Sequence, residues 1–467
     1  MKTRIISSKQ IIIDKRFDGS YHNAEINIYD SVITAHSSHN LSYYCSDIFT
    51  SGRNKRAYTT PNKGLPFLSN SDVAMANPFL SCNYSSIKYG FDEKAVLKEG
   101  MILTGRVGSI GQTAYVPKYI EEAKAMGSDN IIRIVVDSKY KNGFIYAFLA
   151  SKIGKLSFLK HSTGGVQPFI TESMVGQIPI PDFPESLQTE VNKLILESAK
   201  LREEAKVMLD LAEKELKSKA GLPDLCPEEY DYYGQSQSNR KVSCFARNIK
   251  ELGTTSINAF NHSERIRLIT QKMACKTIPL REAIQGGATF SSTGAPSIEV
   301  KPGKGIMMIN QKDIFDNIIR GKWISNRGIK LDNLVDYGEV LIACDGTLGE
   351  SELFCRAIFA NEDLKGSFIS SHFIRMKATE EITSGYLYTW LNSDYGFRFI
   401  RNTQAGTKLC HPINKMFLNI PIPVLGNDDI KAIDSIVKTA HSKRHESNLK
   451  ELEAIQLIEQ EIEKWNK

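Results

Sequence analysis

The sequence of 467 residues lacks the patterns that mark metal centres, disulfide scaffolds and membrane spans. Its eight cysteines form no CxxC pair and no zinc-binding spacing, which favours free thiols in a reducing compartment. No apolar run approaches 18 residues, and the opening MKTRIISSKQ does not have the form of a signal peptide. We therefore expect a soluble, cytoplasmic protein.

Catalytic signatures are also missing. There is no Walker A motif and no HExxH, and the loop Thr104–Gly111 fits neither glycine-rich nucleotide motif, so a tight turn explains its glycines. The tripeptide at 77–79, NPF, lacks the second proline of the amino-methyltransferase tetrapeptide. His161, His372 and His411 lie near loops with hydroxyls, but no set of nucleophile, base and orienting acid is repeated along the chain. The sequence favours a binding protein without its own metal or cofactor.

The composition allows real hydrophobic cores and a polyanionic partner. Hydrophobic residues make up 41% of the chain, and the length predicts two or three domains. The formal charge of +6 arises from 59 basic and 53 acidic residues. This mild excess suits nucleic acid as a partner without proving it.

An internal repeat determines the predicted architecture. Residues 143–181 align without a gap on residues 385–423, with 11 of 39 positions identical, including the closing tetrapeptide IPIP. Upstream, glycines 100, 108 and 111 match glycines 338, 346 and 349, and Asp72 matches Asp313. Strands and helices mix without strict alternation, which predicts an α+β fold. The segments between the matched frames are nearly unrelated, which suggests two sites of one kind that bind different targets.

A long helix is expected after each copy. Residues 185–219 contain no Gly or Pro and repeat apolar residues at helical spacing, and residues 428–467 do the same around a polar middle, His441 to Asn448, which is expected to weaken the seam. At about 1.5 Å per residue, the first helix is about 50 Å long. An antiparallel pair joining both domains fits two helices of similar length better than two helices that each dock their own domain. The stripe residues are Val191, Leu194, Leu201, Met208, Ile433, Val437, Leu452, Ile455 and Ile462.

Basic and aromatic residues in the variable segments are the candidate binding residues, because Lys and Arg neutralise phosphates and Arg can also bind base edges. In the first half they are Arg53, Lys55, Arg56, Tyr58, Lys63 and Arg106, with Lys152, Lys155 and Lys160 expected at phosphates. In the second half they are Arg320, Lys322, Trp323, Arg327, Lys330 and Lys408.

The tandem plan of domain, IPIP exit and long helix, repeated at an offset of 242 residues, resembles the specificity subunit of type I restriction-modification systems over essentially the whole chain. The resemblance implies target-recognition domains at 1–183 and 244–426, spacer helices at 184–221 and 427–467, and a connector at 222–243. It also implies a non-catalytic prokaryotic subunit in which each domain binds one half of a bipartite site on double-stranded DNA. The partners would be modification (methyltransferase) and restriction (translocase-nuclease) subunits, which would bind S-adenosylmethionine, and ATP with Mg²⁺.

Two other functions stay open at this point. One is a stand-alone DNA methyltransferase or nuclease that carries its own recognition domains, for which binding of S-adenosylmethionine to the isolated chain would argue. The other is a coiled-coil scaffold that joins proteins without DNA. A DNA binder is distinguished from that scaffold by a steep loss of affinity between about 50 and 200 mM salt.

Overall fold

A computed structural model of the chain describes residues 5–14, 17, 19, 21–22, 24–37, 39–53, 56–108, 110–164, 167–231, 235–236, 243–252, 255–294 and 298–465. It divides into two units, one of residues 1–203 and 446–467, the other of residues 204–445. Each unit thus contains one mixed α and β domain and parts of both long helices. No helix in the described ranges is long and apolar enough to cross a membrane.

The first unit contains two four-stranded sheets, in the orders β2-β9-β6-β7 and β3-β5-β4-β8, and a short pair, β1-β10. The strands are β1 (His39–Asn40), β2 (Cys45–Phe49), β3 (Tyr58–Thr59), β4 (Gly64–Leu68), β5 (Asn83–Ser86), β6 (Ile102–Gly105), β7 (Thr113–Tyr115), β8 (Met126–Gly127), β9 (Ile131–Val136) and β10 (Pro179–Ile180). The helices are α1 (Ser8–Asp14), α2 (Ala24–Ala35), α3 (Leu41–Tyr44), η1 (Pro61–Lys63), η2 (Asp72–Ala74), η3 (Glu93–Ala95), α4 (Lys118–Glu122), α5 (Asn142–Ala150), α6 (Lys152–His161), α7 (Glu172–Gly176) and α8 (Glu185–Lys219), the last of which continues into the second unit.

The second unit repeats the central pairings of the first. Its sheets have the orders β15-β14-β18 and β17-β16-β19, with the pairs β13-β22, β20-β21 and β11-β12. The strands are β11 (Gln235–Ser236), β12 (Ser243–Cys244), β13 (Thr277–Pro279), β14 (Ile306–Ile309), β15 (Lys322–Ile324), β16 (Val340–Ala343), β17 (Ala357–Phe359), β18 (Phe368–Ile369), β19 (Phe373–Met376), β20 (Gln404–Ala405), β21 (His411–Pro412) and β22 (Pro421–Pro423). The helices are α9 (Pro227–Tyr230), α10 (Ile249–Leu252), η4 (Ala259–His262), α11 (Glu264–Gln271), α12 (Leu280–Ala283), η5 (Gln285–Gly287), η6 (Asp313–Phe315), η7 (Leu331–Asn333), α13 (Ser384–Asn392), α14 (Asp394–Asn402), α15 (Asn414–Phe417) and α16 (Asn427–Trp465).

The repeat predicted from the sequence is therefore a repeat of structure. In the first unit β4 pairs antiparallel with β5 and parallel with β8, and in the second β14 pairs in the same way with β15 and β18. The IPIP tetrapeptides form β10 and β22, each of which closes a short antiparallel pair just before a long helix. The predicted α+β class is confirmed.

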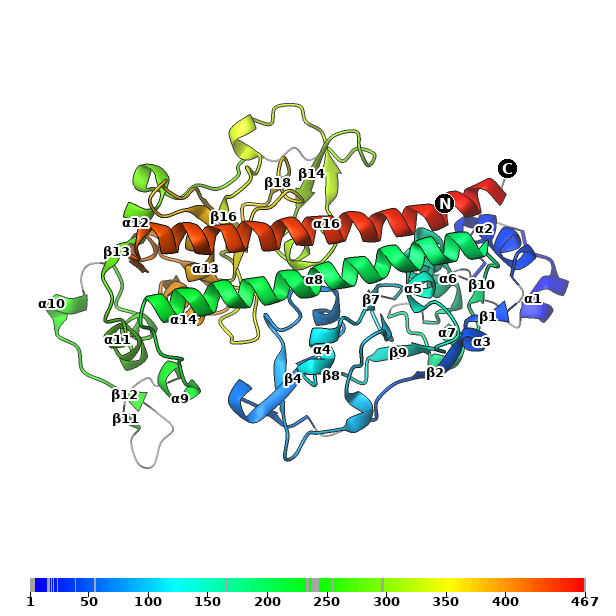
Figure 1. Cartoon of the computed structure of the whole chain (residues 1–467), viewed down its shortest axis with the longest axis horizontal. Helices are drawn as coiled ribbons and strands as arrows, with labels where there is room; N and C mark the ends of the chain where they lie inside the picture. Colours follow the sequence, from blue (N-terminus) through cyan, green and yellow to red (C-terminus); the bar gives the residue numbers. More distant parts are fainter. Residues whose placement is uncertain are drawn as a thin grey trace. The chain divides into compact units, whose positions relative to one another are not determined.

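Within each unit, α8 and α16 lie side by side and run in opposite directions (Figure 1). The core of the first unit includes Val191 and Ile195 of α8 together with Ile458 and Ile462 of α16. The core of the second includes the other ends, with Ala212 and Leu216 of α8 and Ile433 and Val437 of α16. Because each domain packs on the start of one helix and the end of the other, the predicted antiparallel pairing is confirmed.

The expected stripe holds only in part. Val191, Ile433, Val437 and Ile462 are buried, and Leu194 and Ile455 pack against the first core, whereas Leu201 and Met208 are only half-buried. Leu452 is 45% exposed, so its placement in the seam is wrong, and Ala454 and Ile458 are the buried residues on that stretch of α16. Leu452 faces solvent because the face of α16 that packs inward on this stretch carries Ala454 and Ile458.

The polar segment of the second helix does not break it, since α16 runs through His441 to Asn448 without interruption. In the first unit the hydroxyls of Ser198 and Ser447 lie 2.9 Å apart, and Arg202 pairs with Glu451 at 2.7 Å. Glu451 also accepts a 2.7 Å hydrogen bond from the Tyr146 hydroxyl of α5. Buried polar groups are tolerated when they are paired, so these contacts form a polar layer between the two helices in the first unit, whereas the Nε2 atom of the buried His441 has no hydrogen-bond partner among the described residues.

A glycine in each domain, Gly143 of α5 or Gly385 of α13, allows its helix to approach a long helix closely. A Cβ at Gly143 would lie 2.9 Å from the Asn192 side chain of α8, and one at Gly385 would lie 2.9 Å from the Cα of Asp434 of α16. In each unit the glycine amide instead donates to that side chain, at 2.9 and 2.7 Å. The repeated glycine therefore marks the contact between the domain and its own long helix.

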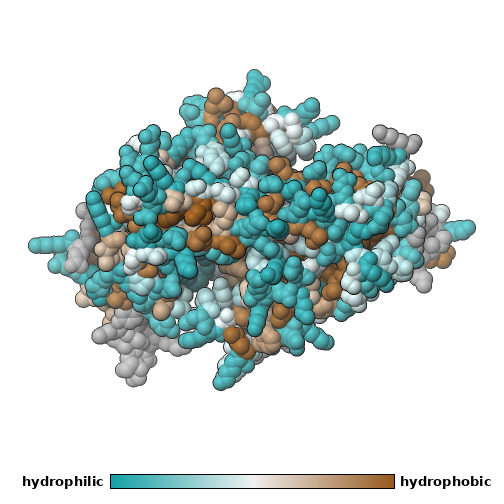
Figure 2. All heavy atoms as spheres, viewed as in Figure 1, coloured by the Kyte–Doolittle hydropathy of each residue, from teal (hydrophilic) through white to brown (hydrophobic). Residues whose placement is uncertain are grey.

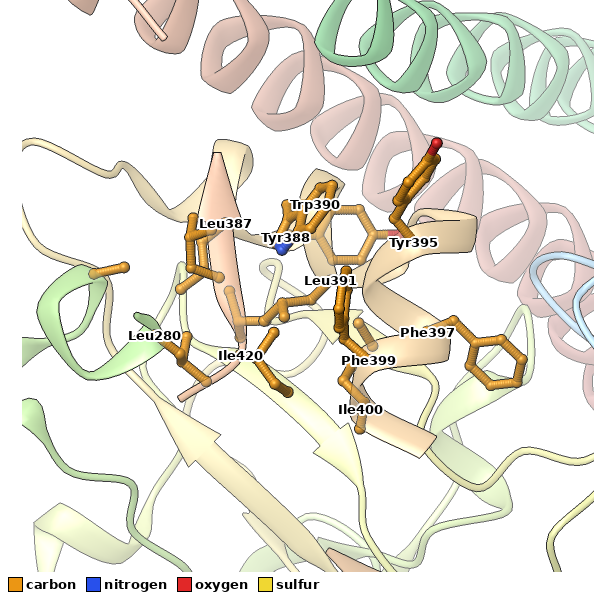
Figure 3. Packing of buried hydrophobic residues seen from close by; sticks show 14 of the residues in the cluster. Leu280, Leu387, Tyr388, Trp390, Leu391, Tyr395, Phe397, Phe399, Ile400 and Ile420 are labelled. Carbon is orange, nitrogen blue, oxygen red and sulfur yellow. The ribbon is translucent and has the colours of Figure 1, made fainter. Parts of the chain in front are cut away.

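The core of the second unit is rich in aromatic residues. Trp390 and Tyr395 are fully buried and lie beside Leu391 and Ile400 in α13 and α14, as Figure 3 shows from close by. Large aromatic side chains bury about 150–250 Å² each. This packing holds the sheets of the domain against the helices and positions the loops at the strand ends.

Candidate nucleic-acid interface

The first domain brings two of its candidate residues to one carboxylate. Arg53 and Arg56 follow β2 and lie 3.3 and 3.2 Å from the carboxylate oxygens of Asp129. Tyr58 begins β3 and packs edge-on against Phe67, with its ring 48% exposed. The arginine side chains are 88% and 52% exposed, whereas Asp129 is 13% exposed, so each guanidinium can donate to a phosphate on its solvent side while Asp129 still holds it.

The cavity under this surface is small. Its volume is about 20 Å³, and it is lined by residues that include Ser51, Arg56, Tyr58 and Asp129. A single water needs about 10–15 Å³ by the same measure, so the cavity accommodates a water and not a nucleobase. The arginines therefore offer a surface for a nucleic-acid backbone. Lys63 is exposed at the end of η1, and Lys55 lies outside the described residues.

Arg106 lies on the glycine-spaced loop, between two segments distant in sequence. Its amide donates to the Asn130 carbonyl at 2.8 Å, and its carbonyl accepts from the Ile170 amide at 2.9 Å. The pKa of the Glu172 carboxyl lies below its usual value, because the Thr50 hydroxyl, its own amide and the Arg106 charge outweigh the opposing effect of burial. The positive φ of Gly108 and Gly111, 83° and 82°, confirms that these glycines form a tight turn.

The lysines predicted at phosphates differ in exposure along α6. Lys152 is exposed, and its ammonium lies 5.9 Å from the centre of the Tyr29 ring. Lys155 is half-buried. Lys160 is only 9% exposed, with its ammonium 5.1 Å from the centre of the Tyr21 ring. Because a buried ammonium is not offered to a ligand, we leave Lys160 out of the DNA-binding set.

In the second domain most candidates lie on and after one short strand. Arg320 precedes β15, Lys322 and Trp323 belong to it, and Arg327 and Lys330 follow it. The four basic residues are exposed, and Trp323 is half-buried opposite Met307 of β14. Lys322 lies 2.7 Å from Glu299 in a pair that is exposed on both sides, unlike the Asp129 carboxylate of the first domain. Lys408 is exposed on a separate loop between β20 and β21.

The carboxyl of Asp316, which precedes this strand in the chain, has a raised pKa. Burial, with the nearby Asp313, raises the pKa of Asp316 to about 6, and Lys312 and Arg320 oppose the shift. Asp316 thus loses negative charge as pH falls toward 6, which leaves the basic residues around β15 less neutralised.

Two features of these surfaces were not found from the sequence. Asp129 holds both arginines of the first domain, although nothing in its own stretch marks it. In the second domain, His372 and His411 both meet Asp345 of the glycine-spaced loop. The sequence does contain a sign of this cluster, because the repeat places the charged Asp345 where the glycine-spaced loop of the first domain has the apolar Val107. The histidines were considered only as parts of a catalytic triad.

Residues 43–197 match a family described as "Type I restriction modification DNA specificity domain". The comparison with curated proteins gave no match.

Similar solved structures include a type I restriction-modification S subunit from M. genitalium, at 13% identity and TM-score 0.34, covering 91% of this chain and 94% of that one. They also include the HsdS subunit from Thermoanaerobacter tengcongensis, at 14% identity and TM-score 0.28, covering 91% and 95%. A third, reported with the assembly and conformational transition of a type I restriction-modification system, has 14% identity and TM-score 0.27 and covers 92% and 96%.

Proposed function

Since the chain belongs to the DNA specificity subunits of type I restriction-modification systems, we propose that its two domains each bind one half of a bipartite site on double-stranded DNA. The observation that carries this proposal is the duplicated frame with unlike loops. The same strands and glycines recur in both units, while Arg53 and Arg56 of one surface and Lys322 to Lys330 of the other have no counterparts. One scaffold thus presents two different basic surfaces.

The DNA-binding set proposed for the first domain is Arg53, Arg56, Tyr58, Lys63, Arg106, Lys152 and Lys155, and Lys55 keeps its place as a sequence prediction. The set for the second is Arg320, Lys322, Trp323, Arg327, Lys330 and Lys408. The domain limits predicted from the sequence, at 183, 221, 243 and 426, are kept as part of the proposal. Phosphate contacts would position each domain, and contacts to base edges would give its specificity.

The proposed partners are modification subunits, which bind S-adenosylmethionine and transfer the methyl group, and restriction subunits, which use ATP and Mg²⁺. We place the complex in the prokaryotic cytoplasm, where its DNA lies. In each unit the long helices offer a docking surface of large apolar residues between 43% and 65% exposed, Leu196, Leu449 and Leu452 in the first unit and Val207 and Leu211 in the second. Figure 2 shows hydrophobic residues among the hydrophilic ones on the face viewed in Figure 1.

The test is to express the chain with the modification subunit of its own operon, to purify the complex and to map methylated adenines across the host genome. A bipartite motif with a fixed gap is the expected result. Replacing either set of basic residues by alanine should relax only one half of that motif. A single uninterrupted motif, or methylation by the isolated chain, would contradict the proposal and would favour a stand-alone methyltransferase.

A further inference from the structure

Three ionisable side chains from separate segments meet on the loops of the second domain. Asp345 follows β16, His372 precedes β19 and His411 begins β21. The Nδ1 atoms of both imidazoles contact the Asp345 carboxylate, one on each oxygen. Asp345 is 16% exposed, while the two histidine side chains are 56% and 55% exposed. The carboxylate therefore lies beneath a pair of imidazoles that face solvent.

The backbone holds this cluster firmly. Gly346 and Cys410 exchange amide hydrogen bonds of 2.8 and 3.3 Å, which tie the loop of Asp345 to the loop of His411. The Gln311 side chain donates to the Asp345 carbonyl at 2.6 Å and accepts from its amide at 3.3 Å. Gln311 lies two residues after β14, the strand that pairs with the basic β15. The cluster is thus connected to the proposed DNA-binding strand.

The chemistry of the cluster follows from its geometry. With Nδ1 directed at the carboxylate, each imidazole presents Nε2 to solvent. Histidine changes charge between about pH 5 and 8. When both rings are protonated, the cluster carries a net charge of +1 and offers two outward N–H donors. When both are neutral, it carries −1 and repels a phosphate.

We propose that Asp345, His372 and His411 form a pH-dependent contact to the DNA phosphate backbone, used by the second domain only. The inference rests on the proposed function, since it assumes that these loops face DNA. It adds a binding site whose net charge changes with pH, which the lysines and arginines of the basic surfaces do not provide. Because the two protonated imidazoles offer outward N–H donors and a net positive charge, we assign the cluster to an anion.

The groups that touch the cluster do not account for a change of charge in this range, whereas Asp316 beside β15, whose pKa burial raises to about 6, adds a pH effect that remains in the double variant. The Cys344 thiol lies 3.9 Å from Asp345, and burial followed by the Asp345 charge raises its pKa to about 12, so the thiol stays neutral. Cys410 is buried, with its sulfur 3.7 Å from the Gly406 carbonyl. Lys408, exposed on the same loop, adds a constant positive charge.

The first domain provides an internal control. At the repeat offsets of 238 and 242 residues, the positions of Asp345, His372 and His411 are occupied by Val107, Asn130 and Phe169. None of these side chains titrates, although the loops are joined in a similar way through a bridge between Val107 and Phe169. A pH-dependent contact at this place is therefore expected in the second half-site alone.

The experiment uses the complex with its modification subunit and a fluorescent duplex that carries the mapped site. Its dissociation constant is measured at pH 6 and pH 8 over a salt series. The slope of log affinity against log salt should be steeper at pH 6 by about one to two phosphate contacts, with affinity about tenfold higher. The double variant His372→Gln/His411→Gln should lose most of this difference.

A second variant guards against misfolding. Asp345→Asn removes the negative charge that remains at high pH, so the duplex should bind more tightly than to the unchanged complex at pH 8, a gain that damage to the fold does not produce. The matched control is His445→Gln, which removes another histidine paired with an aspartate, Asp363 at 2.6 Å, in the same unit. It should leave the pH dependence unchanged.

The outcomes separate the two levels of the proposal. A complex that binds the duplex at neither pH contradicts the proposed function. A complex that binds it with the same pH dependence in the unchanged and double-variant forms overturns the histidine site alone. A pH effect that disappears when the first half-site is scrambled, and persists when the second is, assigns the switch to the wrong domain and also overturns it.

Discussion

Arg133 and Arg375 occupy the same place in the two domains but are held by different partners. Arg133 is fully buried on β9, opposite Leu103 of β6, and its guanidinium lies over the Phe49 ring. Arg375 is fully buried on β19, opposite Leu341 of β16, and its guanidinium lies over the Phe290 ring. The Arg375 guanidinium makes two 2.8 Å bonds to the Glu339 carboxylate. It also donates to the carbonyls of Asn333 and Leu334 at 2.9 and 2.7 Å. The Arg133 guanidinium donates to carbonyls alone, those of Ser128, Ile131, Ala95 and Gly127.

The difference comes from one position. Met101 of the first domain matches Glu339 of the second, at an offset of 238 residues. Without the carboxylate, burial lowers the pKa of Arg133 to about 10, an effect that the charges of Asp92 and Asp129 only partly oppose. The duplicated frame thus keeps the buried arginine for its shape and its many donors, and its electrostatic compensation has changed independently in each copy.

The strongest test of this comparison is to place the residue of the first domain in the second. Glu339→Met leaves the Arg375 guanidinium buried without its carboxylate and should lower the free energy of unfolding by about 3–5 kcal/mol. Urea denaturation followed by circular dichroism measures the loss. The double variant Glu339→Met/Arg375→Met should recover much of it, because no charge stays unpaired. A double variant less stable than the single one would show that the ion pair does not explain the difference.

Tyr146 and Tyr388 are also matched, and they sharpen the comparison of the helix contacts. The Tyr146 hydroxyl donates to Glu451, whereas the Tyr388 ring packs against His441 and Phe359. Tyr146→Phe should cost about 1.5–3 kcal/mol of unfolding free energy, because it removes a hydrogen bond to a buried charge. Tyr388→Phe should lower the free energy of unfolding by less. Thermal unfolding of the two variants measures both losses. Equal losses would mean that the polar layer contributes no more than packing.

Gly385 and Gly143 test how the domains approach their long helices. Alanine at either position should destabilise the protein by about 1–3 kcal/mol, the usual cost of overpacking. The loss should be larger at Gly385, where the added Cβ meets the backbone of Asp434 at 2.9 Å. Gly426→Ala is the control, because its nearest neighbour would be the Asp429 carboxylate at 3.7 Å. Differential scanning calorimetry ranks the three, and an equal effect at Gly426 would refute the steric explanation.

The smallest expected effects distinguish the two basic surfaces. Arg53→Ala and Lys322→Ala each remove one exposed cation, so each should weaken binding of the complex about tenfold or less and reduce the salt slope by about one. The decisive measurement is competition between duplexes with one half-site scrambled. The loss caused by Arg53→Ala should shrink only when the first half-site is scrambled, because only a docked domain makes its phosphate contact, and the loss caused by Lys322→Ala should shrink only when the second is. A variant whose loss shrinks equally with either half-site scrambled would contradict separate recognition.

The frame of the fold was predictable because it is repeated. The glycines at 143 and 385, the IPIP exits and the helix at 185–219 are local signals, and they correspond to observed contacts and to α8. The buried Arg133 and Arg375 are separated by 242 residues and their phenylalanines, Phe49 and Phe290, by 241, which are the offsets of the repeat. They were missed because a charged residue inside a strand is not expected to be buried.

The remaining contacts and exposures depend on how distant segments pack against each other, which local sequence patterns do not indicate. Glu451 lies 305 residues from Tyr146, and neither residue alone indicates the other. The exposure of Leu452 and the burial of Lys160 follow from how the helices are rotated against their neighbours. Within the candidate site, charge marked the basic residues correctly as exposed, while the carboxylate that pairs with Arg53 and Arg56, Asp129, comes from the distant loop between β8 and β9.

The most direct test of the central claim, that two domains bind separate half-sites held apart by the helix pair, is to shorten that pair. Seven residues are removed from α8 between Val191 and Leu216, together with the seven that face them on α16, and methylated adenines are mapped across the genome. The deletion shortens the pair by about 10 Å, or about three base-pair steps. We predict unchanged half-sites with a shorter gap. Active complexes that methylate the original motif with its original gap would contradict the claim.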